Sequence, residues 1–200
     1  MIISFIEKQK MNIEDRKAIA CIIKEGFWGK IGNFFRNVNS DESSNILEQA
    51  ITFDKGFYYK ENGIVLGVAL LATRNTPYMN FKRRLRKRLG FWNGFMLQLG
   101  FGTMKPKLED GLKLEMLAVS PNARGKGVGK KMLAHLRDLA LREGFKRITL
   151  EVIDSNEKAK HLYLREGYED KKYINTALFT RKMGFRGHFK MQKDIRQDII

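Results

Sequence analysis

The sequence predicts a single α/β domain in which helices flank a mixed central β-sheet. Three observations favour this class. Strand-like and helical segments alternate from residue 111 onward, an Asn62-Gly63 pair separates two strand-like runs, and 43% of the 200 residues are hydrophobic. This apolar share is sufficient for one core and argues against a disordered or low-complexity chain. We therefore expect one domain over residues 1–200.

The first part of the chain predicts a strand, two helices and a hairpin. Its apolar start is typical of an opening strand and lacks the basic residue and small-residue cleavage site of a signal peptide. Asn12 can cap a helix whose apolar residues recur at helical spacing, and the polar cluster 43–45 predicts the start of a second helix. The runs 57–59 and 64–72 on either side of Asn62-Gly63 predict an antiparallel pair.

Residues 73–110 are interpreted as an insertion into the domain. The run 82–88 carries six positive charges and no acidic residue, and aromatic residues follow it. Such a segment resembles an amphipathic element that lies on an anionic membrane or on RNA. A lid or a simple insertion is the favoured interpretation.

From residue 111 onward the predicted elements are sharper. Residues 111–119 alternate as a strand with at least one fully apolar face, a helix that begins near Val128 ends at Gly144, and 148–152 form another strand. Asn156 can cap a shorter helix. The apolar face of the strand at 111–119 is predicted to consist of Leu112, Leu114, Met116 and Ala118. Two last strands are predicted over 177–183 and 188–193.

Charge and cysteine content limit the classes of partner and site. Thirty-eight Lys and Arg residues against 22 Asp and Glu give a net charge of +16, which favours anionic partners such as nucleic acid, acidic lipid or phosphorylated small molecules. Cys21 is the single cysteine, so there is no internal disulfide framework, and we expect it to fill the helix core. With three histidines it forms no zinc cluster of standard spacing, so no metal is predicted. A reducing, cytoplasmic location is expected.

The glycine-rich segment Arg124-Gly125-Lys126-Gly127-Val128-Gly129 lies between the apolar strand and an amphipathic helix. Alternate glycines allow a ligand to approach the backbone closely, and amide groups at the start of a helix favour a diphosphate. Two other phosphate loops do not match. A Walker A loop needs a hydroxyl residue after its lysine, and a dinucleotide fingerprint needs a small residue near position 130, which is Lys130.

This segment resembles the Gln/Arg-x-x-Gly-x-Gly/Ala signature of the GCN5-related N-acetyltransferase (GNAT) family. Residues 115–121 resemble the end of that family's fourth strand, and 156–168 resemble its second conserved motif. The resemblance extends loosely from residue 2 to about 195 and is weakest over 73–110. It implies a GNAT-like domain whose fourth and fifth strands splay apart, and transfer of an acetyl group from acetyl-CoA directly to an amine.

The resemblance also implies roles for individual residues. Tyr163 is the implied general acid, because a phenol with an ordinary pKa of about 10 is protonated at neutral pH. Glu115 is the implied general base, with Lys113 as the alternative position. The backbone N–H of Leu117 or Ala118 is implied to support the oxyanion, and Asn156 to contact the amide region of the cofactor or a bound water. The other implied cofactor-binding residues are the following: Leu117, Ala118 and Val119 for the pantetheine arm, and Arg124, Gly125, Lys126, Gly127, Val128, Gly129 and Lys130 for the pyrophosphate.

Each of these residues also has a structural interpretation. Tyr163 can be a core aromatic residue, Asn156 only an N-cap, and Glu115 a salt-bridged strand residue. In this family acceptor specificity comes from regions that correspond to residues 24–45 and 183–188. The aromatic residues of the first region either line an acceptor pocket or pack in the core: Phe27, Trp28, Phe34 and Phe35.

The predicted function is acetyl transfer to a primary amine of a small molecule or peptide. The partners are then acetyl-CoA and the amine, while the oligomeric state stays open, a homodimer included. The alternative is a non-catalytic module of the same fold that binds RNA or an anionic membrane through its basic surface. The intact cofactor and acid positions favour the enzyme.

Overall fold

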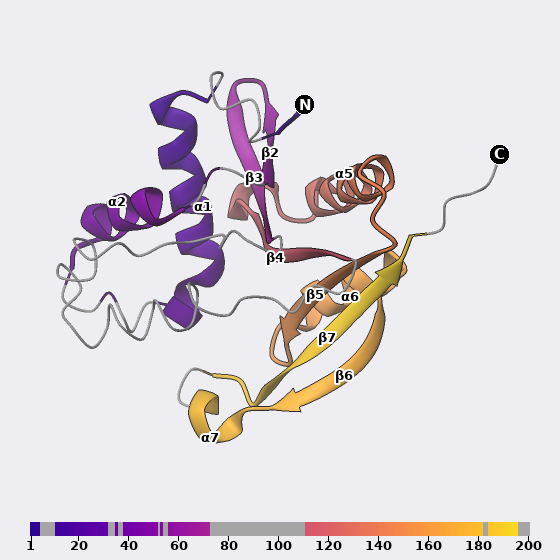
Figure 1. The fold of residues 1–200 in the computed structure, drawn as a ribbon. Coiled ribbons are helices and arrows are strands. Elements are labelled where there is room, and N and C mark those ends of the chain that lie inside the picture. Colours follow the sequence, from indigo (N-terminus) through magenta and orange to yellow (C-terminus); the bar gives the residue numbers. More distant parts are fainter. Residues whose placement is uncertain are drawn as a thin grey trace.

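A seven-stranded sheet lies between helices on both of its faces in the computed structural model (Figure 1). Residues 1–4, 11–31, 35, 38–51, 53, 56–72, 111–181 and 184–195 are described. The strands are β1 (Ile2–Ser4), β2 (Gly56–Glu61), β3 (Ile64–Ala72), β4 (Gly111–Val119), β5 (Arg147–Ile153), β6 (Glu169–Asn175) and β7 (Gly187–Asp194). The helices are α1 (Ile13–Ile31), α2 (Ser40–Ala50), the 3-10 turn η3 (Pro121–Ala123), α5 (Val128–Arg142), α6 (Glu157–Arg165) and α7 (Ala177–Thr180).

The sheet has the order β1-β2-β3-β4-β5-β7-β6. All neighbours are antiparallel except β4 and β5, which run parallel. The predicted mixed α/β sheet is therefore confirmed. The parallel pair is joined through α5, because parallel neighbours need a crossover connection.

Two hydrophobic cores lie on opposite faces of this sheet. On one face, α1 and α2 pack against β2, β3 and β4 around residues such as Ile19, Ile23 and Tyr58. On the other face, α5 and α6 cover the sheet from β2 to β7 around residues such as Met132 and Leu136. The two helix pairs can be followed on either side of the strands in Figure 1.

Short-range signals placed several elements correctly. The hairpin between β2 and β3 turns through Asn62 at φ 49° and Gly63 at φ 80°, the paired left-handed residues that a two-residue turn of this hand requires. The Asn12 side chain accepts a hydrogen bond from the Asp15 amide at 2.7 Å, just ahead of α1. The predicted hairpin and helix cap are confirmed.

A buried polar cluster fixes α1 on the sheet. The carboxylate of Asp15 is buried, and it accepts hydrogen bonds from Tyr58 Oη at 3.0 Å and from Lys60 Nζ at 2.8 Å. Both donors come from β2, so these hydrogen bonds join the helix to the strand. Because a buried carboxylate is costly without partners, the cluster specifies one position of α1 on β2.

The end of the chain differs from the prediction. Residues 177–180 form the short helix α7, and the predicted strand over 177–183 is wrong. The strand that precedes β7 is instead β6, whose sequence EDKKYIN is exposed along almost its whole length. As an edge strand β6 buries neither face, so it carries no alternation of polar and apolar residues, and charged residues are favoured there.

Two further predictions were wrong in detail. Helix α2 begins at Ser40, earlier than the 43–45 cluster, and its cap is Asn39, whose side chain accepts from the Glu42 amide at 2.8 Å. Cys21 is exposed, because the buried stripe of α1 follows Ile19, Ile22 and Ile23 and leaves position 21 on the opposite side of the helix.

The predicted insertion at 73–110, with its basic run 82–88, lies outside the described residues. Within the described part of the chain, no helix combines the length and the apolar character that crossing a membrane would require.

Candidate active site

β4 and β5 separate partway along their length. Residues 111–114 of β4 pair with residues 147–150 of β5, and the pairing ends there. β4 continues to residue 119 along β3, whereas β5 continues to residue 153 along β7. We call the unpaired part, residues 115–119 of β4 and 151–153 of β5, the fork. The expected splay is confirmed, and the backbone groups of β4 that face β5 have no strand partner among the described residues.

A β-bulge in β4 lies at the base of the fork. On β3, Leu71 pairs with Leu114 and Leu70 pairs with Met116, so Glu115 is the extra residue between them. A bulge bends and twists the strand that carries it, which accounts for the divergence of β4 from β5 at this point. It also reverses which side chains face each core. Leu112 and Leu114 pack with α5, whereas Met116 and Ala118 pack with α1 and α2, so the prediction that these four residues share one apolar face was wrong.

The bulge places the Glu115 side chain beside Lys113. Lys113 Nζ lies 2.9 Å from Glu115 Oε1, and only 12% of the Glu115 side chain is exposed. Burial raises the pKa of the Glu115 carboxyl above its ordinary value, and the Lys113 ammonium group opposes this increase. A carboxyl group with a raised pKa is better suited to accept a proton near neutral pH than an ordinary surface glutamate.

A glycine bend, residues 124–130, follows the fork and leads into α5. Gly125 at φ 77° and Gly127 at φ 78° are both left-handed, and a Cβ atom at either position would have no heavy atom within 4 Å. Space is therefore open above both glycines. Five backbone amides of the bend donate no hydrogen bond to any described residue: those of Gly125, Gly127, Val128, Gly129 and Lys130.

Positive side chains surround the glycine bend. Arg124 Nε donates to the Val119 carbonyl at 3.3 Å, which ties the bend to the end of β4, and Lys131 Nζ donates to Tyr59 Oη at 3.3 Å. Lys126 and Lys130 are exposed. Free amides at a helix N-terminus, open space and exposed lysines together fit a diphosphate group.

Gly129 brings the start of α5 close to α6. A Cβ atom at Gly129 would lie 3.1 Å from Leu162 Cδ2, so only glycine allows this approach without displacing Leu162. The next residue, Tyr163, is 8% exposed and belongs to the α5 and α6 core together with Leu114 and Leu150 at the base of the fork. The contact of Gly129 with Leu162 therefore fixes the position of the glycine bend relative to Tyr163, the predicted acid.

The Tyr163 hydroxyl has properties suited to an acid. Burial raises the pKa of Tyr163 to about 12, so the phenol stays protonated at neutral pH. Its hydroxyl has no hydrogen-bond partner among the described residues. It keeps a small exposure to solvent, because Tyr168 Oη is the single fully buried side-chain oxygen or nitrogen without a partner in that part of the chain. The Tyr163 and Tyr168 rings meet edge to face with centroids 5.8 Å apart.

Asn156 caps α6 and lies where the chain leaves β5. Its Oδ1 accepts from the Ala159 amide at 3.2 Å, which confirms the predicted cap. The side-chain amide nitrogen forms no hydrogen bond to a described residue, so the cap leaves a donor available for a ligand.

The two predicted catalytic side chains lie on opposite faces of the sheet. Tyr163 belongs to the core formed with α5 and α6, whereas Glu115 lies with Lys113 on the other face. The sequence analysis missed Glu151 of β5, which lies 3.7 Å from Lys113 Nζ. The alternation of Leu150, Glu151 and Val152 was the available signal, because it directs a carboxylate away from the core beside the parallel strand.

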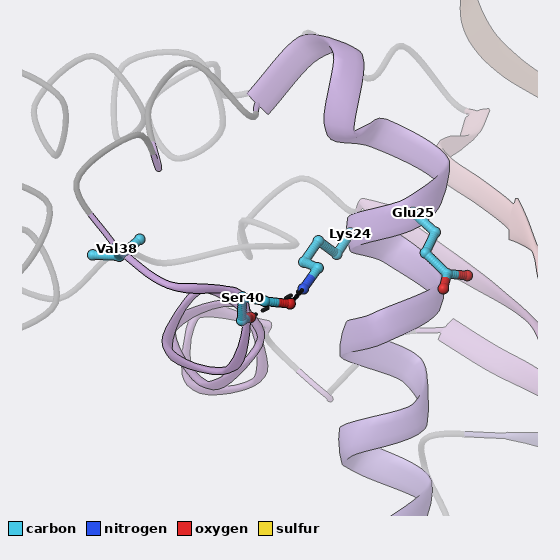
Figure 2. Close-up of a pocket in the computed structure, with 4 residues that line it drawn as sticks. All are labelled: Lys24, Glu25, Val38 and Ser40. Atoms are coloured by element: carbon cyan, nitrogen blue, oxygen red, sulfur yellow. Dashed lines mark hydrogen bonds between the residues drawn. The ribbon is translucent and has the colours of Figure 1, made fainter.

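The region expected to set acceptor specificity contains a cavity of about 420 Å³ between α1 and α2, lined by Lys24, Glu25, Val38 and Ser40. Figure 2 shows Lys24 directed at Ser40, to whose carbonyl and hydroxyl its Nζ donates at 3.0 and 2.8 Å. None of these four residues belongs to the fork or the glycine bend. Phe35 is buried in the α1 and α2 core, which favours the packing interpretation for that residue.

Comparison with known proteins gives matches to acetyltransferases. A family model described as "Acetyltransferase (GNAT) family" matches residues 31–168. An uncharacterised N-acetyltransferase, YhfO, of Bacillus subtilis is 42% identical over 57 residues, which are 28% of this chain and 38% of that protein. A streptothricin acetyltransferase of Streptomyces lavendulae is 39% identical over 57 residues, 28% of this chain and 30% of that protein. The chain thus spans about a third of the length of these relatives.

The fold is shared with solved acetyltransferase structures. An N-acetyltransferase from Staphylococcus aureus superposes with a TM-score of 0.64 at 17% identity, covering 96% of this chain and 99% of that one. At this identity the likeness concerns the fold alone. The family model, however, matches well over half of the sequence, including the fork, the glycine bend and α6. The chain therefore belongs to the GNAT acetyltransferase family.

Proposed function

We propose that this protein is an acetyl-CoA-dependent N-acetyltransferase that moves the acetyl group directly to a primary amine of a small molecule or peptide. The observation that carries the proposal is the fork with the glycine bend at its open end. A strand edge without a partner is an acceptor for an extended ligand chain, and the adjacent amides and lysines suit a diphosphate. Acetyl-CoA combines both chemical features and supplies a thioester.

The glycine bend would hold the pyrophosphate through the amides of residues 125 and 127–130. The free edge of β4 would pair with the pantetheine arm at Leu117, Ala118 and Val119. A backbone N–H at Leu117 or Ala118 would stabilise the negative charge that develops on the carbonyl oxygen. The free amide nitrogen of Asn156 would donate to the cofactor arm or to a water beside it.

Two side chains would move protons. Glu115 would accept a proton from the attacking ammonium or amine group, through water, and its raised pKa supports this role. Tyr163 would donate its phenolic proton to the departing sulfur, and its protonation at neutral pH supports this role. Because the two groups lie on opposite faces of the sheet, amine and thiol would approach the reacting carbon through the fork from opposite sides.

The test has two measurements on the full chain. Acetyl-CoA at about one hundred times its dissociation constant is expected to add roughly 2.7 kcal/mol to the free energy of unfolding. For a chain of this size, this raises Tm by about 5–11 °C. A panel of small amines, lysine side-chain amines and peptide α-amines, followed by thiol release, is expected to give turnover with at least one class.

The absence of both stabilisation and thiol release would contradict the proposal. A salt-sensitive increase in Tm with RNA and none with acetyl-CoA would support the nucleic-acid-binding alternative instead.

We also place the protein in the cytoplasm, on the ground that its single cysteine suits a reducing compartment.

A further inference from the structure

Five charged or titratable side chains form a cluster at the base of the fork, on the face opposite α5 and α6. Lys113 and Glu115 come from β4, Glu151 from β5, and His188 and Lys190 from β7. Four of them alternate along their strands with residues that pack in the α5 and α6 core, and the fifth, Glu115, lies at the bulge. All five side chains are therefore on the face opposite that core. We call these five residues the charged cluster.

Lys113 is shared between two carboxylates. Its Nζ lies 2.9 Å from Glu115 Oε1 and 3.7 Å from Glu151 Oε1. Two further basic side chains lie beside Glu151, since His188 Nε2 lies 3.6 Å from its Oε2 and Lys190 Nζ lies 3.8 Å from its Oε1. Glu115 has Lys113 alone as an ion-pair partner among the described residues.

The two carboxylates also differ in exposure. The Glu151 side chain is 38% exposed, against 12% for Glu115. Glu151 therefore keeps more contact with solvent than Glu115, and two lysines and a histidine surround it. Among the described residues of β3, α1 and α5, which also contact β4, no charged group contributes to the electrostatics at Glu115. The protonation of Glu115 thus depends on its own burial, on Lys113 and on the charge of Glu151.

We propose that Glu151 is a positioning residue of the transfer reaction, which shares the Lys113 ammonium group with Glu115 and so sets the pH at which Glu115 becomes able to accept a proton. Only the link to catalysis rests on the proposed function. The electrostatic coupling of the three groups is a property of the charged cluster itself.

Both effects of Glu151 act in the same direction. Its negative charge disfavours a second carboxylate nearby, and at 3.7 Å from Lys113 Nζ it competes with Glu115 for the same ammonium group. Replacing Glu151 with glutamine removes the charge and leaves Lys113 to Glu115, so the pKa of Glu115 must fall. For like charges bridged by one ammonium group, this corresponds to about 0.5–2 pH units.

The direct test is a titration of the Glu115 carboxyl carbon by ¹³C NMR in the full chain labelled at glutamate. The resonance is identified by its absence in Glu115→Gln. In Glu151→Gln its midpoint is expected about 0.5–2 pH units lower than in the wild type, and in Lys113→Met it is expected higher. The matched control is Glu169→Gln on β6, which removes the same charge from a side chain that is 74% exposed and should leave the midpoint unchanged.

An unchanged Glu115 midpoint in Glu151→Gln, or an equal displacement in Glu169→Gln, would overturn the inference. The pH profile of kcat/KM then separates this result from the proposed function. If Glu115 is the base, the acidic limb of the profile moves with the NMR midpoint in both Glu151→Gln and Lys113→Met. A midpoint that moves while the acidic limb stays fixed would refute Glu115 as the base and Glu151 as its positioning residue, leaving only the electrostatic coupling. If Glu151 had a merely structural role, Glu151→Gln would change activity without moving the Glu115 midpoint or the acidic limb of the pH profile.

Discussion

Gly127 offers a direct test of the glycine bend, because the strain of a substitution there can be separated from its effect on a ligand. In the free protein a Cβ atom at Gly127 has no heavy atom within 4 Å, so Gly127→Ala introduces no clash. The cost comes from φ 78°, which L-residues adopt reluctantly, and amounts to about 1 kcal/mol of unfolding free energy. This corresponds to a decrease in Tm of about 2–4 °C.

Gly144 is the matched control for this variant. It has φ 74°, lies just beyond the other end of α5, and likewise has no heavy atom near its Cβ position. Gly144→Ala is therefore expected to lower Tm by the same amount. If the open space above Gly127 holds a diphosphate, only Gly127→Ala also crowds the ligand. Overpacking of about 1–3 kcal/mol then weakens acetyl-CoA binding by about 5- to 150-fold.

The measurement is acetyl-CoA titration by calorimetry on both variants, together with unfolding in urea without ligand. Equal stability losses with a selective loss of affinity in Gly127→Ala are the expected result. If the two variants bind acetyl-CoA equally well, the space above Gly127 is not where the cofactor lies, and the assignment of the bend is refuted.

Three further predictions concern the two buried tyrosines. Tyr163→Phe is expected to lower kcat by about 100-fold or more while the dissociation constant for acetyl-CoA stays the same, as measured by thiol release and calorimetry; unchanged turnover would remove the phenol from the reaction. Burial raises the folded-state pKa of Tyr163 to about 12, so the stability it contributes is complete below the unfolded value of about 10 and is lost as the pH rises from about 10 to 12. Over this interval the wild type should lose about 3 kcal/mol more unfolding free energy than Tyr163→Phe, and parallel urea-derived profiles would contradict this. Tyr168→Phe removes a buried hydroxyl without a partner and should increase the free energy of unfolding by about 1–2 kcal/mol, whereas a decrease in thermal or urea stability would indicate a hydrogen bond at that hydroxyl.

The elements that could be predicted from the sequence are those specified by neighbours along the chain. The Asn62-Gly63 turn, the cap at Asn12 and the glycine bend before α5 each depend on a few consecutive residues. The family resemblance rests on the same kind of local pattern, in the bend and in α6. For this reason the predicted order of strand, bend, helix, strand and helix over 111–165 agrees with the structure.

The features that escaped prediction depend on distant pairing. The bulge at Glu115 exists only in the register between β3 and β4, and the sequence of β4 alternates without interruption across it. β6 could not be identified because an exposed edge strand needs no apolar residues. Glu151 was missed because the charged cluster arises where β4, β5 and β7 lie side by side, three strands whose order in the sheet no local pattern specifies.

The extra residue of the bulge, Glu115, is not required for the packing of β4. If Glu115 were deleted, Leu112 and Leu114 would still face α5, and Met116 and Ala118 would still face α1, because the shortened strand would alternate regularly with every remaining side chain on its present side. Neither hydrophobic core needs the additional residue. The bulge residue is instead needed for β4 to separate from β5. A chain without Glu115 should pack both cores well but keep β4 and β5 together, with no gap in which two reactants could meet.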